Sequence, residues 1–257
     1  MGSIWAEIAD KSHTERQISF LKNHLKRGGV VLDVACGTGR HLTTLSEAEF
    51  DMVGLDASAN LLRIAKQRQP SAQLVRGDMR FLPFKTEAAT AAISMDTSFG
   101  YLPQENDDQK SLADLHRVLG RGAVLVLDVF NPEHLSLKYG HRGLLKRLKW
   151  AALPLMLKLH SRWLLFRVFK WREYASFCLL QKRTVSRSGG LLRDLWVVWE
   201  KSTGKLAFFE HRVRLYDKSK LQALLGGVGF AVEEVYGDYD GQRFAADSPR
   251  LIFKSKS

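Results

Sequence analysis

Residues 30–42 read VVLDVACGTGRHL, an apolar run followed by a glycine turn and a helical pattern. The run contains one acid, Asp33, and is typical of a strand buried on both faces of a parallel sheet. Gly37 and Gly39 carry no Cβ, so a ligand can approach the backbone of this turn closely. The helix that follows from Arg40 offers unpaired amides at its N-terminus. The stretch therefore predicts a ligand site at the carboxyl end of a buried strand.

Strand patterns alternate with helical patterns along most of the chain, which indicates βαβ units. Strands are predicted at 29–34, 51–56, 72–78, 88–96, 122–130, 231–237 and 249–256. Helices are predicted at 14–27, 40–49, 58–68, 106–120 (closed by Gly120) and 218–230. The GDYDG segment between the last two strands is too short for a helical crossover, so these strands should pair antiparallel. We expect an α/β fold with a Rossmann-like, seven-stranded, mostly parallel sheet whose last strand is antiparallel.

The alternation stops after the fifth strand. Two amphipathic helical pieces come first, at 141–152 and 154–171. Three strand-like runs follow, at 174–186, 191–201 and 204–216. Because the fifth strand should end at the ligand edge, we expect residues 132–212 to form a helix-plus-β-meander lid, or substrate subdomain. We expect this lid to be inserted within a single domain that spans residues 1–257.

The basic character of the chain belongs to this insertion. The net charge is +12, from 39 basic and 27 acidic residues. Ten of the basic residues and none of the acidic ones lie between His134 and Arg172. Three interpretations stay open: an apolar stripe packed on the domain, a helix pair over 141–171 on an anionic membrane, and contact with RNA phosphates. The tryptophans of the segment fit an apolar face as well as an RNA site, so RNA is the least favoured.

Composition also predicts where the protein works. Two cysteines, Cys36 and Cys178, do not make a disulfide framework, which favours a reduced intracellular setting. The sequence shows no signal-peptide pattern and no apolar run of about 20 residues. We expect a cytoplasmic protein, peripheral to the membrane if 141–171 binds lipid. No cysteine or histidine spacing indicates a metal site.

Acids lie in or after four consecutive predicted strands: Asp33, Asp56, Asp78 and Asp96. Because the carboxyl ends of parallel strands meet at one edge of a sheet, these acids should gather there. Asp56 is placed to accept hydrogen bonds from ribose hydroxyls, and Asp78 from an adenine amino group. Leu42 stands where a dinucleotide fingerprint needs a small residue, and no phosphate-binding Walker motif is present. The pattern favours a nucleoside that has no phosphates and carries an amino-acid tail.

The segments VLDVACGTGRH, VGLDAS, GDMRFLPF and ISMDTSFGYL resemble, in order, the cofactor motifs of class I S-adenosylmethionine-dependent methyltransferases. The late RLYDKSKLQALLGGVGF and YGDYDGQRFAADSPRLI resemble a bacterial and archaeal branch of mostly small-molecule methyltransferases. The resemblance covers roughly residues 14–131 and 211–256. It implies S-adenosyl-L-methionine as cofactor and S-adenosyl-L-homocysteine as product.

The resemblance further implies which residues bind the cofactor. From methionine to adenine they are Ala35, Gly37 and Gly39 through backbone, Asp33 near the ammonium, Asp96 and Ser98 beside the methionine and methyl, Asp56 at the ribose, and Asp78 and Met79 at the adenine. Arg40 and His41 are either ligand contacts or a solvated helix start. The N-terminal helix can add contacts from Trp5, His13 and Gln17.

Methyl transfer is an in-line displacement on an already activated methyl group, so alignment and exclusion of water are the main demands. A base is needed only when the acceptor has a proton to lose. Topology places Tyr101, His211 and Tyr239 near the predicted edge as catalytic candidates. We predict methyl transfer to a small, hydrophobic or lipid-like acceptor. The alternatives are an RNA methyltransferase that uses the basic lid and a non-catalytic cofactor-binding partner subunit. The sequence indicates neither the acceptor atom nor the oligomeric state.

Overall fold

The computed structural model describes residues 4, 7–8, 11–139, 171–186 and 188–257. The chain divides into two compact units, one of Met1–His134 with Arg214–Ser257 and the other of Leu135–Val213.

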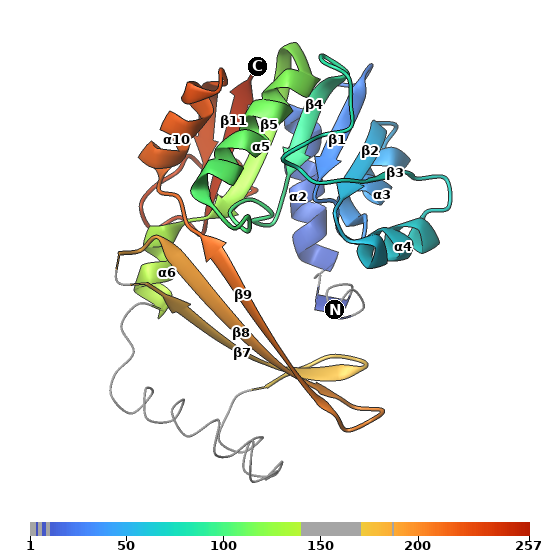
Figure 1. The fold of residues 1–257 in the computed structure, drawn as a ribbon, viewed down its shortest axis with the longest axis vertical. Helices are drawn as coiled ribbons and strands as arrows, with labels where there is room; N and C mark the ends of the chain where they lie inside the picture. Colours follow the sequence, from blue (N-terminus) through green and yellow to red (C-terminus); the bar gives the residue numbers. More distant parts are fainter. Residues whose placement is uncertain (1–3, 5–6, 9–10, 140–170, 187) are drawn as a thin grey trace. The chain divides into compact units, whose positions relative to one another are not determined.

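The first unit is built on a seven-stranded sheet (Figure 1). Its strands in chain order are β1 (Val30–Val34), β2 (Asp51–Asp56), β3 (Gln73–Arg76), β4 (Ala89–Ser94), β5 (Leu119–Phe130), β10 (Ala231–Tyr236) and β11 (Arg250–Lys256). Across the sheet they run β10-β11-β5-β4-β1-β2-β3. The pairs from β5 to β3 are parallel, whereas β11 is antiparallel to both β5 and β10. The predicted Rossmann-like sheet with an antiparallel last strand is confirmed.

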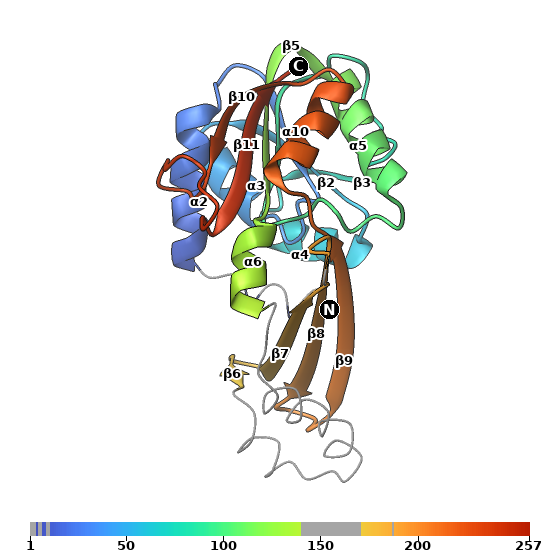
Figure 2. The ribbon, with the colours of Figure 1, turned by 90° about the vertical axis from the view of Figure 1, so that its left-hand side faces the viewer.

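Helices cover both faces of this sheet: α2 (Lys11–His24), α3 (Arg40–Glu47), α4 (Ala59–Arg68), α5 (Glu105–Val118) and α10 (Lys218–Gly227). Figure 2 shows α2 on one side of the sheet and α5 and α10 on the other. Neighbouring strand residues alternate between two apolar cores, as in the pairs Leu32 and Val31, Leu125 and Val126, and Phe253 and Ile252. This double burial explains the continuous apolar runs of the central strands.

One predicted boundary is wrong. Gly120 does not close the helix before the fifth strand, because α5 ends at Val118 and β5 begins at Leu119. The pairing of β5 with β4 shifts register between Ala89 and Ala91, so the residues around Gly122, which has φ +75°, bulge from the ladder. In the sequence, a bulged glycine pair looks the same as a helix C-cap.

The second unit contains a four-stranded sheet in the order β6-β7-β8-β9. Its strands are β6 (Arg172–Glu173), β7 (Phe177–Val185), β8 (Leu191–Glu200) and β9 (Leu206–Arg214), and β7 pairs antiparallel with β8. The three strand-like runs of the insertion are therefore strands. The helical pieces at 141–152 and 154–171 lie outside the described residues except for Trp171, so the three interpretations of the basic segment stay predictions. The described part of the chain has no helix that is long and apolar enough to cross a membrane.

The insertion is entered through α6 (Pro132–Tyr139), which the sequence patterns did not predict. Asn131 precedes it, and the side-chain oxygen of Asn131 accepts a hydrogen bond of 3.0 Å from the Glu133 amide. The side-chain nitrogen of Asn131 donates to the carbonyls of Ala246 and Ser248. This residue therefore joins the end of β5 to the loop before β11.

The chain returns to the first unit through a buried ion pair. Asp108 of α5 has no exposed surface, pairs with Arg214, and accepts a hydrogen bond of 2.6 Å from the Tyr216 hydroxyl. Arg214 also donates to the carbonyls of Leu102 and Pro103 in the segment after β4. The cluster thereby fixes the end of β9 to the loop that leaves the carboxyl end of β4.

Asp108→Ala should lower the free energy of unfolding by about 3 kcal/mol, because it leaves the Arg214 charge and the Tyr216 hydroxyl without a partner. The matched control is Glu105→Gln on the same helix, whose pair with Lys220 is about half exposed; its effect should stay below about 1 kcal/mol. Urea unfolding followed by circular dichroism measures both, and equal losses in the two variants would contradict the assigned role.

Candidate active site

The turn after β1 is held in an unusual backbone conformation. Ala35, Gly37 and Gly39 have φ values of +61°, +57° and +73°. A Cβ built on Gly37 meets nothing within 4 Å, whereas one on Gly39 would lie 2.9 Å from the Ala65 Cβ of α4. Gly39 is therefore required by helix packing, and Gly37 leaves the open space that a ligand needs.

Asp56 fixes this turn to the end of β2. It is 7% exposed and accepts hydrogen bonds from the Gly37 amide at 2.9 Å and from the Ser58 amide at 2.8 Å. The two bonds use different carboxylate oxygens, and an ionised carboxylate has about four acceptor positions. Asp56 can therefore accept further hydrogen bonds from a pair of ligand hydroxyls.

Asp33 is the least satisfied acid at this edge. It is 1% exposed, and its Oδ2 has no hydrogen-bond partner among the described residues. Burial raises the pKa of Asp33 to about 7, against the opposing effect of the nearby Arg40. A buried carboxylate with an unused oxygen suits a cationic ligand, so the site fits the ammonium of the implied cofactor.

Asp78 follows β3 and is engaged by its neighbour Arg80. The guanidinium lies 2.6 Å from the carboxylate, and the Arg80 amide donates to it at 2.9 Å. These hydrogen bonds hold the pKa of Asp78 below its usual value. Met79 packs at the margin of the core beneath α5, and Phe81 is 69% exposed beside it. The sequence interpretation missed Arg80, although a cation two residues after an acid was visible.

A buried amide joins four chain segments at the same edge. The Gln17 side chain of α2 has no exposed surface. Its nitrogen donates to Asp96 at 2.8 Å and to the Tyr239 hydroxyl at 2.9 Å. Its oxygen accepts from Arg40 at 2.7 Å and from His41 at 3.0 Å. Burial lowers the pKa of His41 well below its ordinary value, so the ring is neutral and its Nε2 carries the donated hydrogen.

Asp96 stands at the exposed margin of this network. Its carboxylate pairs with Arg40 and lies 3.3 Å from the His13 Nε2. Asp96 and Thr97 have φ values of +54° and +61°, a strained conformation that costs about 1–3 kcal/mol per residue. The Asp96 amide donates to the Asp128 carboxylate at 2.8 Å, which offsets part of this strain. The hydroxyl of Ser98 donates to the Met95 carbonyl at 2.6 Å.

Asp128 at the end of β5 anchors the far side of the network. It is fully buried and accepts from Tyr239 at 2.7 Å and from the Arg250 guanidinium at 2.8 Å. Arg250 also donates to the Thr97 hydroxyl at 2.9 Å. Burial raises the pKa of Tyr239, so its hydroxyl stays protonated and acts as a donor. This placement favours a positioning role for Tyr239.

The structure brings together many of the predicted residues. Asp33, Asp56 and Asp96 lie at the ends of neighbouring strands, and Gln17, Arg40, His41 and Tyr239 are hydrogen-bonded into the network. Trp5 lies outside the described residues. Tyr101 follows β4 in the first unit and is 43% exposed. His211 belongs to the second unit, where its ring packs edge-on against Trp196, and burial lowers the His211 pKa. Catalytic roles for Tyr101, His211 and Tyr239 stay predictions.

The sequence interpretation missed Asp128 and Arg250 as site residues. Asp128 carried the same signal as the other acids, since it stands near the end of a predicted strand. Arg250 carried no such signal, because it begins the last strand and reaches Asp128 only through the sheet pairing of β11 with β5. No group of three or more metal-ligating side chains is arranged for a metal in the described ranges.

Comparisons with known proteins agree with this geometry. Residues 31–122 match the family model described as a methyltransferase domain. YqeM of Bacillus subtilis (strain 168), which carries a provisional methyltransferase name, is 23% identical over 99% of this chain and 94% of its own length. A glycine/sarcosine N-methyltransferase of Parasynechococcus marenigrum (strain WH8102) is 38% identical over 51% of this chain, and the match spans 49% of that enzyme.

Solved structures share the fold. The CcbJ methyltransferase of Streptomyces caelestis superposes with a TM-score of 0.75 at 16% identity, over 95% of this chain and 89% of CcbJ. CalS10 of Micromonospora echinaspora, an amino pentose methyltransferase solved with S-adenosylmethionine bound, has a TM-score of 0.67 at 19% identity, over 99% of this chain and 94% of CalS10. The sequence matches, the strand order and the acidic edge of the sheet together support a class I S-adenosylmethionine-dependent methyltransferase.

Proposed function

We propose that this enzyme methylates the nitrogen of a small-molecule amine. The observation that carries the proposal is the His13–Asp96 pair, whose side chains are 42% and 41% exposed at the margin of an otherwise buried network. The exposed carboxylate can attract an ammonium group, and the imidazole can accept its proton. The glycine/sarcosine and amino pentose enzymes named above are similar proteins whose names specify amine acceptors.

The chemistry requires an acceptor nitrogen with a free lone pair. Bound S-adenosylmethionine supplies a methyl group on a sulfonium, which leaves as a neutral thioether. Asp96 would hold the incoming ammonium, and His13 would take its proton, so that the nitrogen lone pair is available at the methyl carbon. Arg40 and Gln17, both bonded to Asp96, would keep the carboxylate in place.

The cofactor roles of individual residues belong to the same proposal. The unpartnered Asp33 oxygen supports an ammonium contact, and the open space at Gly37 supports close backbone approach along Ala35–Gly39. The remaining acceptor positions of Asp56 support a ribose contact. Because the Ser98 hydroxyl is bonded to Met95, Ser98 would contact the cofactor through its backbone. Asp78 and Met79 would meet the adenine next to Arg80.

The predicted hydrophobic or lipid-like acceptor and the contact with anionic membrane both depend on 141–171, outside the described residues. They stay predictions, as do RNA methylation with the basic lid, the lid role of 132–212 and the cytoplasmic location. We propose an amine acceptor because the residues that support it, His13 and Asp96, are among those that the structure describes.

Incubation with methyl-labelled S-adenosylmethionine and a panel of primary amines, amino sugars, lipid extract and RNA tests the proposal. We expect label in the amine fraction. His13→Ala should lower kcat on the best amine about 100-fold at pH 7, and the loss should shrink near pH 9.5, where more acceptor is already deprotonated. Glu15→Ala, exposed on the same helix, is the control. Label confined to lipid or RNA, or a His13→Ala defect independent of pH, would overturn the proposal.

Asp56→Ala should weaken S-adenosylmethionine binding by about 1–3 kcal/mol, or roughly 5- to 150-fold in Kd, because it removes the ribose acceptor and releases the Gly37 amide. Asp51 begins the same strand and is exposed, so Asp51→Ala is the matched control and should leave Kd within twofold. Titration calorimetry on both variants measures the difference; unchanged affinity in Asp56→Ala would contradict the role.

Cofactor affinity should rise between pH 6 and pH 7.5. Burial raises the pKa of Asp33 to about 7, so the carboxylate is mostly protonated at pH 6 and ionises across this range. A cationic ammonium prefers the ionised form, so the affinity gain approaches about tenfold if only that form binds. Asp33→Asn should abolish most of this dependence. For the unchanged enzyme, calorimetry in buffers of different ionisation enthalpy should detect proton release when the cofactor binds. A cofactor affinity that does not change between pH 6 and pH 7.5 would contradict the proposed role of Asp33.

A further inference from the structure

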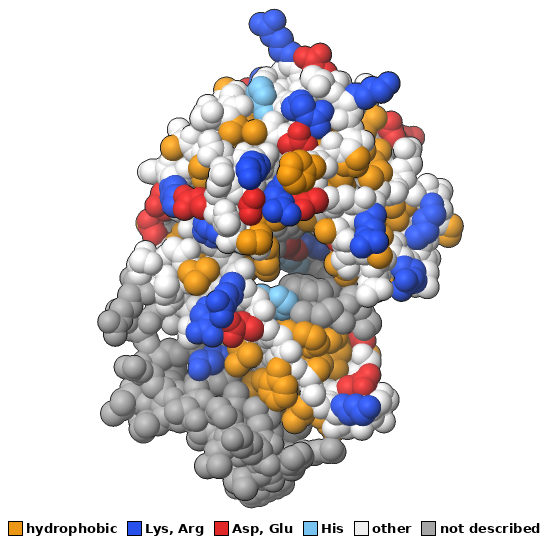
Figure 3. All heavy atoms as spheres, in the orientation of Figure 1, with side chains coloured by type: hydrophobic (Ala, Val, Ile, Leu, Met, Phe, Trp, Pro, Cys, Tyr) orange, Lys and Arg blue, Asp and Glu red, His pale blue; other side chains and the backbone are white. Residues whose placement is uncertain are grey.

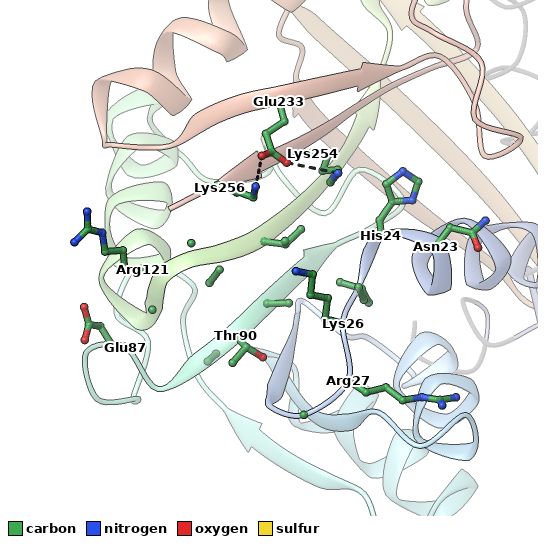
Figure 4. Close-up of a pocket in the computed structure, with 18 residues that line it drawn as sticks. Asn23, His24, Lys26, Arg27, Glu87, Thr90, Arg121, Glu233, Lys254 and Lys256 are labelled. Atoms are coloured by element: carbon green, nitrogen blue, oxygen red, sulfur yellow. Dashed lines mark ion pairs between the residues drawn. The ribbon is translucent and has the colours of Figure 1, made fainter.

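A second hollow lies at the opposite edge of the first unit's sheet, where β1 and β4 begin (Figure 4). We call it the basal pocket. It measures about 500 Å³, within the range of small-molecule sites. Small residues line part of it, among them Gly28, Ala89, Ala91 and Ala123. The space therefore exists because no large side chain fills this part of the sheet.

Cations outnumber carboxylates around the basal pocket. The lining contains Lys26, Arg27, Arg121, Lys254 and Lys256, against only Glu87 and Glu233. By contrast, basic and acidic side chains are interspersed on the face of the first unit that carries α5 and α10 (Figure 3). Outside the basic insertion the chain is nearly neutral, with 29 basic and 27 acidic residues. The excess of positive charge around the basal pocket is thus a local feature.

Lys26, Lys254 and Lys256 line the pocket together with one carboxylate, Glu233. Lys254 is partly buried, and the other two lysines are exposed. Figure 4 shows Lys26 directed into the pocket from the segment after α2, opposite Glu233 of β10. Glu233 is shared by Lys254, at 3.5 Å, and Lys256. No ion pair of Lys26 with a described residue is present. The interior therefore has two positive charges more than its own carboxylate neutralises.

The carboxylate of Glu234, next in the chain to Glu233, does not neutralise these two positive charges. Glu234 lies 3.1 Å from Lys254, but it also accepts from the Tyr236 hydroxyl at 2.6 Å and from Arg243 at 2.9 Å. His24 also lines the pocket. Its Nδ1 bonds the Phe20 carbonyl, and its Nε2 bonds the Tyr236 oxygen, whose proton is committed to Glu234.

We propose that the basal pocket binds a phosphate-bearing small molecule through Lys26, Lys254 and Lys256. Convergent ammonium groups act as point charges that suit phosphate oxygens. A phosphate monoester or diphosphate carries the two or more negative charges that the interior lacks, whereas a single carboxylate would leave it positive. The phosphate can belong to a soluble ester or to a lipid headgroup, since both present the same group. The site is at the edge opposite the acidic strand ends, so it is independent of methyl transfer.

Calorimetric titration of the full chain with pyrophosphate and with ADP tests the proposal. Saturating S-adenosylhomocysteine is present throughout, so that ADP cannot report on the cofactor site. We expect one saturable site whose Kd weakens at least tenfold in Lys26→Gln and further in the double variant Lys254→Gln/Lys256→Gln. Lys22→Gln, exposed on α2, is the control of equal charge change and should stay within twofold. All variants should keep the S-adenosylmethionine Kd and the melting temperature of the unchanged protein.

Flotation with phosphatidylglycerol vesicles, compared with phosphatidylcholine vesicles, separates the two sources of phosphate. Because 141–171 is present in every variant, only a difference between Lys26→Gln and Lys22→Gln reports on the basal pocket. Loss of vesicle binding in Lys26→Gln without binding of soluble probes supports a headgroup ligand. Absence of saturable binding to all probes, or equal weakening in Lys26→Gln and Lys22→Gln, would overturn the proposal.

Discussion

The hydrogen bond from the Gly37 amide to the Asp56 carboxylate holds the end of β1 to the end of β2. The left-handed turn through Ala35 and Gly39 forms around this bond, and α3 starts directly after it. Arg40 and His41 can enter the buried network only because the helix begins at this point. The same bond leaves Gly37 facing open space, so one interaction sets both the wall of the proposed cofactor site and the start of the helix that follows it.

Paired carboxylates then determine which distant segments must meet. Asp128 is compensated by Arg250 and Tyr239 from the C-terminal part of the chain, and Asp96 by Arg40 and Gln17 from the N-terminal part. Leaving the buried Asp128 unpaired would be costly, which fixes the loop before β11 against the sheet. The partly exposed Asp96 adds a contact with α2 through Gln17. Asp33 is the exception, with one oxygen unused. Its missing partner is what a cationic cofactor can supply.

The sequence predicted the parts of this account that depend on local pattern. Apolar runs located the strands, acids marked their carboxyl ends, and the short GDYDG loop predicted the antiparallel β11. Gln17 and Arg250 were harder, because their importance arises from partners that lie 79 and 122 residues away. Gly120 misled because a glycine in a strand bulge and a glycine after a helix look alike. The basal pocket had no motif, since its lysines come from separate segments that only the sheet order brings together.

A crystal structure of the full chain with S-adenosylhomocysteine tests the central claim most directly. The account predicts that the amino-acid tail lies along the Ala35–Gly39 turn with its ammonium near Asp33, and that Asp56 accepts hydrogen bonds from the ribose hydroxyls. Density for the nucleoside away from this edge of the sheet, or a turn closed by side chains at saturating ligand, would contradict it.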